Sequence, residues 1–475
     1  MKPSELAVPN PQGTDRLTFF ACVVFGFMIF FAIVSGRCLY ADGSYYLLRV
    51  LQAGNFTEMI HSRCFAAYLF QLPVVVAFKL GITNLHWLTL AFGVGCFSAW
   101  PVAMWLCYRM APQHFWLVML ACALGYLNAA FMAVGEHIVA HAFFWPALFA
   151  VLFVRPLTPA SAGVLLVSAG LLLRSYESLL FLGPPLAGLA VWRLVSGDDR
   201  RGPKVVLGLA AVLFICASGI ALQAVLHPDS PANAGGFKRG VWLALVFPSW
   251  TLVMSYFWIL LMLATNYPQV AQLLNRRAGF VVMGLAVLLW GAWPLLVPEQ
   301  LNPADQYDSR FFNLLVPMLL LPLAVLMAVK PRWLAGQARS LARFSAAMLI
   351  AQSLWHLSAT CQWRGYVHEW RKLLATQNGP ILLADVYGVE NSRNGQALRF
   401  DWDWANPTMG LFLGPSQVQA LVMPEVLAGW QPFDPLKPKD LPDLHRYGLN
   451  YSRYVSALLK FNETNQNPNL RPLHE

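Results

Sequence analysis

Residues 17–35 read LTFFACVVFGFMIFFAIVS, an uninterrupted apolar stretch without a charged side chain, and Lys2 and Arg16 lie before it. A helix needs about 20 mostly apolar residues to cross a bilayer, so this stretch is long enough to do so. The apolar region of a cleavable signal peptide is shorter. We therefore expect residues 17–35 to form a first membrane-spanning helix.

The composition of the whole chain has the same character. Of its 475 residues, 57% are hydrophobic and only 12% are charged, whereas soluble globular proteins carry about 25% charged residues. The apolar stretches do not alternate residue by residue, which excludes a β-barrel. The formal net charge is +10, and the Lys and Arg residues are scattered between these stretches. Nucleic-acid binding needs basic residues clustered on one surface. The composition predicts an all-α polytopic membrane protein that binds no nucleic acid.

Lys and Arg collect in alternate connections between the apolar stretches, and the positive-inside rule places such connections in the cytoplasm. The stretches cover residues 17–36, 64–80, 85–107, 115–134, 138–154, 160–173, 179–192, 205–226, 241–264, 278–297, 311–329 and 344–361. The charge alternation agrees with a cytoplasmic N-terminus only if one early stretch does not cross. The stretch 64–80 is short and contains Gln71, Pro73 and Lys79, so we expect it to lie at the outer surface. About eleven spans then remain in the cell (inner) membrane, with a first outer loop over residues 37–84.

The chain changes character after residue 361. Residues 362–475 have no apolar stretch of spanning length, and eleven Lys or Arg balance eleven Asp or Glu. Short strands are expected over 380–385 and 418–423, and short helices over 364–374 and 451–460. We therefore expect a transmembrane domain over residues 1–361 and a small α/β domain over 362–475 on the external, periplasmic side.

A carboxylate follows closely on the first span. The first outer loop begins RCLYADGSYY at residues 37–46, so Asp42 stands at the rim of the membrane beside aromatic side chains. In this position Asp42 can deprotonate a hydroxyl on a water-soluble or lipid-borne acceptor. The alternative is that Asp42 caps the next helix, because Asp is a favoured N-cap residue.

This layout resembles a known family. A first span, an Asp just outside it, the Pro-containing stretch QLPVVVAFKLG at residues 71–81 and a second span resemble the GT-C superfamily of polytopic glycosyltransferases. The resemblance is to the branch of the protein O-mannosyltransferases and the lipid A aminoarabinose transferases. The arrangement of spans and loops is similar over residues 15–360. Similarity of individual residues is confined to 37–84. Many members carry an Asp-Glu pair in this loop, whereas here Gly43 follows Asp42, which leaves one carboxylate fewer to hold a metal ion.

The resemblance implies an enzyme, a GT-C glycosyltransferase. Such an enzyme transfers a sugar from a polyprenyl-phosphate-linked donor to a lipid, glycan or protein acceptor on the periplasmic face, with inversion at the anomeric carbon. Asp42 would be the catalytic base. No nucleotide is needed, in agreement with the lack of a Gly-rich phosphate loop. No metal ligands are predicted, and a divalent cation as cofactor stays an open alternative.

The leaving lipid phosphate calls for cations, because Arg binds phosphate through two parallel hydrogen bonds. The candidates on the outer side are Arg63, Lys79, Arg174, Arg239 and Arg310. For three of them a structural role is the alternative to phosphate binding. Arg174 can form an i,i+3 ion pair with Glu177, Arg310 can pair with Asp308, and Arg239 can anchor its loop at the membrane interface.

Other polar side chains on the outer side are candidates for contacts with the acceptor or a head group. They are Tyr45, His61, Glu136, His137, Glu177 and Asp308. His137 and His141 have an i,i+4 spacing that can hold a metal ion, but no third ligand is apparent, and structural histidines are the alternative. The sequence DWDW at residues 401–404 fits sugar stacking, or a strand with buried Trp side chains.

The main competing class is a multi-pass transporter or flippase of lipid-linked or small substrates. Transporters tend to place ionisable residues at mid-membrane and to have two related halves. Here the spans are nearly uncharged and no halves are apparent, which favours the enzyme. A disulfide between Cys38 and Cys64, which flank one polar loop, is also left open.

Overall fold

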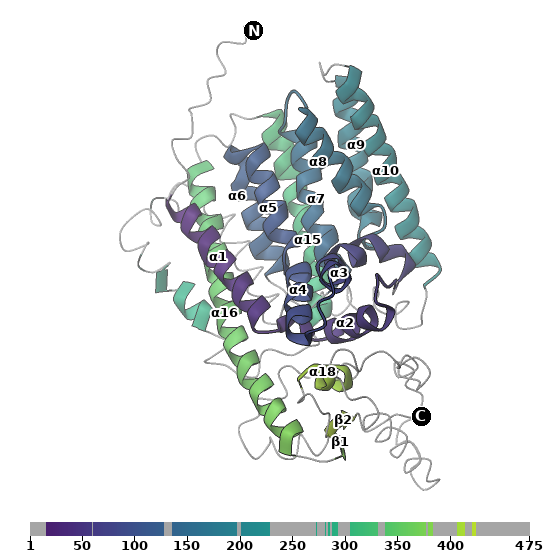
Figure 1. The fold of residues 1–475 in the computed structure, drawn as a ribbon. Helices are drawn as coiled ribbons and strands as arrows, with labels where there is room; N and C mark the ends of the chain where they lie inside the picture. The colour runs from purple at the N-terminus through teal and green to yellow at the C-terminus, as the bar shows by residue number, and fades with distance from the viewer. Residues whose placement is uncertain are drawn as a thin grey trace.

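The protein is a bundle of helices with a smaller C-terminal part at one end (Figure 1). The computed structural model describes residues 16–58, 60–127, 135–196, 201–228, 305–330, 338–376, 379–382, 406–413 and 420–423, and short pieces between 272 and 292. In Figure 1 helix α2, helix α18 and strands β1 and β2 lie toward the same end, which we call the α2 end.

The described α-helices include every apolar stretch that falls wholly within the described residues. In chain order they are α1 (Arg16–Val34), α2 (Asp42–Ala53), α3 (Cys64–Lys79), α4 (Leu85–Phe97), α5 (Ala99–Met110), α6 (Phe115–Ala121), α7 (Glu136–Leu152), α8 (Pro159–Leu172), α9 (Leu179–Ser196), α10 (Arg201–Leu226), α15 (Asp305–Val329), α16 (Ala338–Thr376) and α18 (Asn406–Leu413). Short turns of helix precede some of them: η2 (Arg37–Leu39), η3 (His61–Arg63), η4 (Pro112–His114) and η5 (Cys122–Tyr126).

Among the described helices, four are long and apolar enough to cross a membrane. They are α1, α9, α10 and the segment His61–Lys79, which contains α3. The pair of α4 and α5, bent by 45° at the break between them, makes a fifth candidate. This agrees with a helical membrane protein. The count of eleven spans and the surface position of residues 64–80 stay predictions, and the stretch 241–264 lies outside the described residues.

Helix α16 departs from the sequence prediction. A span over 344–361 and a separate short helix over 364–374 were expected, but the structure has one helix of 39 residues. The helix continues because Trp363, Tyr366 and Trp370 keep a buried apolar face after the span. It also runs through residue 361, where the domain boundary is predicted.

The exit of α1 is fixed to α16 by buried polar contacts. Arg37, which is fully buried, donates to Thr360 Oγ1 at 2.9 Å and to the carbonyl oxygen of His356 at 3.4 Å. Trp363 Nε1 donates to the carbonyl oxygen of Ser35 at 2.9 Å. These bonds hold the chain where it leaves α1 and so position the start of α2.

A close backbone approach fixes α3 against α4. A Cβ atom on Gly95 would lie 1.9 Å from the carbonyl oxygen of Phe70, so only glycine fits at this crossing. Cys38 and Cys64, near the two ends of the first loop, are both buried free thiols, so the predicted alternative of a disulfide is wrong.

The C-terminal part contains a two-stranded parallel sheet of β1 (Gly379–Leu382) and β2 (Ala420–Met423). Both strands fall within the stretches predicted as strands, apart from one residue at the start of β1. Helix α18 contacts α2, where the hydroxyls of Ser44 and Thr408 are 2.9 Å apart. The predicted helix at 451–460 and the DWDW sequence lie outside the described residues, and a separate external domain stays a prediction.

Candidate functional site

Asp42 is the first residue of α2. The N-cap position belongs to Ala41, whose φ of 52° lies in the left-handed region that favours glycine. A turn closed by the Gly43 N–H and the carbonyl oxygen of Tyr40, at 3.1 Å, sets this geometry. The alternative that Asp42 serves as the N-cap is therefore wrong. Its carboxylate lies in the first turn, where the helix dipole favours negative charge.

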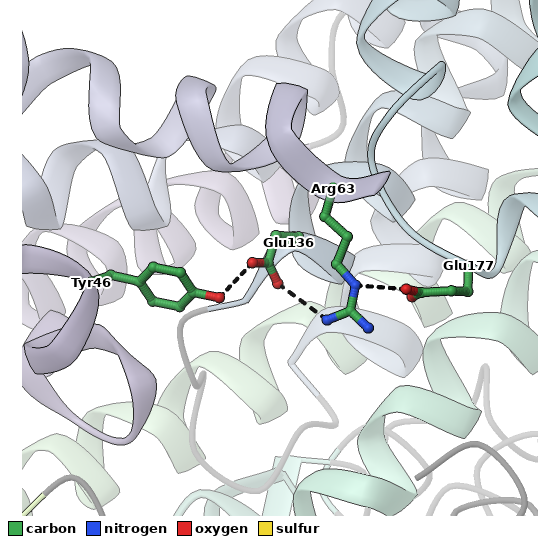
Figure 2. Close-up of polar contacts among 4 residues, drawn as sticks. All are labelled: Tyr46, Arg63, Glu136 and Glu177. Carbon is green, nitrogen blue, oxygen red and sulfur yellow. Dashed lines mark hydrogen bonds and ion pairs between the residues drawn. The ribbon is translucent and has the colours of Figure 1, made fainter. Parts of the chain in front are cut away.

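Tyr46 lies one helical turn after Asp42 on the same face of α2. Its hydroxyl donates a hydrogen bond to Oε1 of Glu136, the first residue of α7 (Figure 2). Both side chains are buried. Burial raises the pKa of Tyr46 well above its ordinary value of 10.0, and the negative charges of Glu136 and Asp42 raise it further. Tyr46 is therefore a neutral hydrogen-bond donor at physiological pH.

Arg63 joins two carboxylates (Figure 2). Its Nε donates to Glu177 Oε1 at 2.8 Å, and its Nη1 lies 3.7 Å from Glu136 Oε2. The side chains of Arg63, Glu136 and Glu177 are 12%, 4% and 17% exposed. The guanidinium also lies 4.7 Å from the ring centroid of Tyr176. One buried cation thus faces two carboxylates, which leaves the cluster with a formal charge of −1.

We call Tyr46, Arg63, Glu136 and Glu177 the buried cluster. Its members come from α2, from η3, from the start of α7 and from the connection between α8 and α9. The cluster therefore ties the first loop to the bundle at the α2 end.

Two further contacts hold Arg63 in place. The buried Gln71 side chain accepts a hydrogen bond from the Thr57 N–H at 2.9 Å and donates to the Thr57 carbonyl oxygen at 3.0 Å. The Phe65 N–H donates to the carbonyl oxygen of Arg174 at 3.0 Å. The first contact fastens the loop before η3 to α3, and the second fastens the start of α3 beside the connection that carries Glu177.

Arg174 does not pair with Glu177, so that alternative is wrong. Glu177 binds Arg63, and Arg174 Nη1 donates to His61 Nε2 at 2.7 Å. Because an arginine can only donate, His61 Nε2 is an acceptor and its Nδ1 carries the proton that contacts Glu58. The His61 side chain is 67% exposed.

His137 and His141 lie deeper, along one face of α7. Both are buried, and their rings lie 5.5 and 6.4 Å from the ring of Tyr176. His141 Nδ1 donates to the carbonyl oxygen of His137 at 2.7 Å. Within the part of the chain that the structure describes, no three His, Cys, Asp or Glu side chains are grouped to hold a metal ion.

The other predicted residues are spread out. The Tyr45 ring lies beside that of Tyr46, at 6.4 Å. Lys79 is exposed at the far end of α3, roughly 24 Å from Arg63 along the chain at the helical rise. Asp308 and Arg310 lie in the first turns of α15, but their side chains and all of Arg239 fall outside the described residues.

The sequence prediction missed two aromatic residues of this region. Tyr46 bonds to Glu136, and Tyr176 stacks on Arg63. Each has a signal in the sequence, because Tyr46 follows Asp42 by one helical turn and Tyr176 stands between Arg174 and Glu177.

Comparisons of the chain with protein-family models, with curated proteins and with solved structures found no match. The fold and the buried cluster are those of a helical membrane protein with a polar, net acidic group at one end of its bundle.

Proposed function

We propose that the protein is a membrane glycosyltransferase that moves a sugar from a polyprenyl-phosphate-linked donor to a lipid, glycan or protein acceptor. One observation carries the proposal. Asp42 opens α2 directly after the membrane exit of α1, on the same helix face as Tyr46, whose hydroxyl bonds to Glu136 of the buried cluster. A carboxylate thus stands at the first residue of a helix that the Tyr46–Glu136 bond ties to α7.

The reaction is an inverting displacement. The acceptor oxygen attacks the anomeric carbon, the bond from that carbon to the phosphate oxygen breaks, and the bonding electron pair leaves with the lipid phosphate. Asp42 takes the proton of the acceptor hydroxyl, a general-base step. Tyr46 and Glu136 keep α2 in place relative to α7, so the carboxylate keeps its position while the acceptor binds.

Arg174 is the cation that we assign to the donor phosphate. Arg63 is already bound to Glu177 and Glu136, whereas Arg174 contacts a neutral imidazole nitrogen of His61. A phosphate can replace that neutral partner, and Arg binds phosphate through two hydrogen bonds. Lys79, Arg239 and Arg310 stay further candidates for the same role. His61, Glu177 and Tyr45 stay candidates for contacts with the acceptor, as do Glu136, His137 and Asp308.

The orientation that we propose places the α2 end on the periplasmic side of the cell membrane and the N-terminus in the cytoplasm. The two ends of α7 support it. Glu136 begins this helix, and the buried Arg193 donates to the carbonyl oxygens of Ala150 and Val151 in its last turn, at 2.8 and 2.9 Å. Arg155, which follows α7, and Arg193 both lie at the end of α7 away from Glu136. The positive-inside rule, which counts Lys and Arg, favours the cytoplasm for that end.

Reporter fusions test this orientation. A reporter near residue 200 should be cytoplasmic, and a reporter after residue 400 should be external. Finding both reporters on one side would overturn the proposed topology of eleven spans and an external C-terminal domain.

Mass spectrometry of glycolipids and glycans from cells with and without the protein tests the activity. We expect loss of one glycosylated product and accumulation of its polyprenyl-phosphate-linked donor. If the purified protein moves the donor between leaflets of a vesicle but transfers no sugar to any acceptor fraction, the protein is a flippase and the proposal is wrong.

A further inference from the structure

The last part of α16 carries a basic face that the proposed reaction does not use. Between residues 363 and 374 the helix buries Trp363, Trp370 and Leu374. The opposite face is exposed, and it carries Arg364, His368, Arg371 and Lys372. At 100° per residue these four side chains fall within an arc of about 100°. We call them the basic stripe.

The basic stripe begins at the membrane boundary. The guanidinium of Arg364 lies 5.8 Å from the ring centroid of Phe31, in the last turns of the apolar helix α1. On the same helix Phe27 and Phe30 are exposed, as expected of side chains that face lipid tails. Arg364 is therefore level with the end of the hydrocarbon region on the side of the α2 end.

The charge of the basic stripe is not neutralised within the described residues. No ion pair of the described residues includes Arg364, Arg371 or Lys372. The exposed Glu369 lies about 60° around the helix beyond Lys372 and so flanks the stripe. An exposed group of three permanent cations and a histidine at a membrane boundary favours an anionic partner.

We propose that the basic stripe binds the head groups of anionic phospholipids in the adjacent leaflet. The stripe rises roughly 12 Å along α16 from Arg364 to Lys372, and long Arg and Lys side chains reach back toward head groups. The attraction of one such cation to an anionic membrane surface corresponds to about a fivefold preference for that surface. The membrane is the partner that the position of Arg364 beside Phe31 indicates.

Lipid binding at this face would steady the outer part of the molecule. The opposite face of the same segment lies beside α18, where a Cβ on Gly410 would be 3.9 Å from Trp370. Helix α18 in turn contacts α2 through Thr408 and Ser44. The basic stripe therefore anchors the segment that supports α2, whatever reaction the protein performs.

Cys361 provides a local probe, because this exposed free thiol lies one helical turn before Arg364. The full chain with Cys216→Ser, which removes the other exposed cysteine among the described residues, is labelled with a fluorophore and placed in nanodiscs of neutral phosphatidylcholine. A small fraction of either phosphatidylglycerol or phosphatidylcholine carries a nitroxide. We expect the labelled phosphatidylglycerol to quench at least about fivefold more than the labelled phosphatidylcholine at low salt.

The combined variant Arg364→Gln, Arg371→Gln and Lys372→Gln should lose the excess quenching by phosphatidylglycerol. The protein with an unchanged stripe should lose it at high salt. A matched variant, Arg109→Gln with Arg201→Gln and Lys204→Gln, removes three charges from α5 and α10 and should keep the excess. Equal quenching by the two lipids in the unsubstituted stripe would overturn the proposal. An excess that survives in the α16 variant would overturn it as well.

Discussion

Arg63 Nε donates to Glu177 Oε1 across 2.8 Å, which joins the start of α3 to the connection between α8 and α9, 114 residues further along the chain. The same guanidinium lies beside Glu136 at the start of α7. A single side chain thus holds three separate segments of the α2 end together. Its two carboxylate partners are largely buried, so they depend on this cation for their charge balance.

Replacing Arg63 should therefore be strongly destabilising. We expect Arg63→Met to lower the free energy of unfolding by about 3–5 kcal/mol, because two buried carboxylates lose their cation. Titration with SDS in mixed micelles measures this change. The triple variant Arg63→Met, Glu136→Gln and Glu177→Gln should regain most of the loss. An Arg63→Met protein as stable as the wild type would contradict the role of the buried cluster.

Tyr46→Phe should show a pH-dependent loss of stability. Glu136 loses a buried donor, which costs about 1–3 kcal/mol near neutral pH. Burial and the neighbouring carboxylates raise the pKa of Tyr46 well above 10.0 in the folded protein. The unfolded chain ionises near 10, so the stability from Tyr46 is complete below that pH and falls above it.

The free energies of unfolding of wild type and Tyr46→Phe should therefore converge as the pH rises above about 10. Parallel SDS titrations at pH 7, 9 and 11 measure the difference, and the other tyrosines cancel because both proteins contain them. A constant difference across this range would show that Tyr46 is not held neutral by its surroundings.

Gly95→Ala tests the crossing of α3 and α4. The new methyl group would lie 1.9 Å from the backbone oxygen of Phe70, which cannot move without shifting α3. We expect a loss of about 1–3 kcal/mol in the free energy of unfolding. Gly26→Ala in α1 is the matched control, because its methyl group would meet no atom within 4 Å. Equal stabilities of the two variants would mean that the crossing is looser than described.

Much of the fold follows from hydrophobic length alone. Apolar stretches such as 17–36 and 205–226 become α1 and α10, because a run of that length has no other way to satisfy its backbone in a bilayer. Residues 364–374 form the continuation of α16, whereas the sequence predicts a separate helix there. Charged residues break the apolar run there, whereas the buried face of Trp363 and Trp370 continues.

The charged residues of the buried cluster were among the sequence candidates, but Tyr46 and the contacts between the residues were not predicted. Arg63, Glu136 and Glu177 stand out as charges at the ends of apolar stretches, and the structure brings them together. The sequence left open whether Arg174 pairs with Glu177 or binds the donor phosphate, because an i,i+3 spacing allows a pair on one helix face. The connection after α8 is not a regular helix, and η3, just before α3, supplies Arg63 from 114 residues away. Such long-range pairing is set by how α3 and α8 pack, which periodicity does not encode.

The central claim is that Asp42 is the base of a sugar transfer. The purified full chain in nanodiscs, with a polyprenyl-phosphate-linked sugar and an acceptor fraction, allows a direct measurement of product by mass spectrometry. Asp42→Asn should lower the rate by about 100-fold or more, with the protein still folded and monodisperse. Glu369→Gln, which removes an exposed carboxylate on α16, should keep the full rate. Transfer at the wild-type rate by Asp42→Asn would contradict the account.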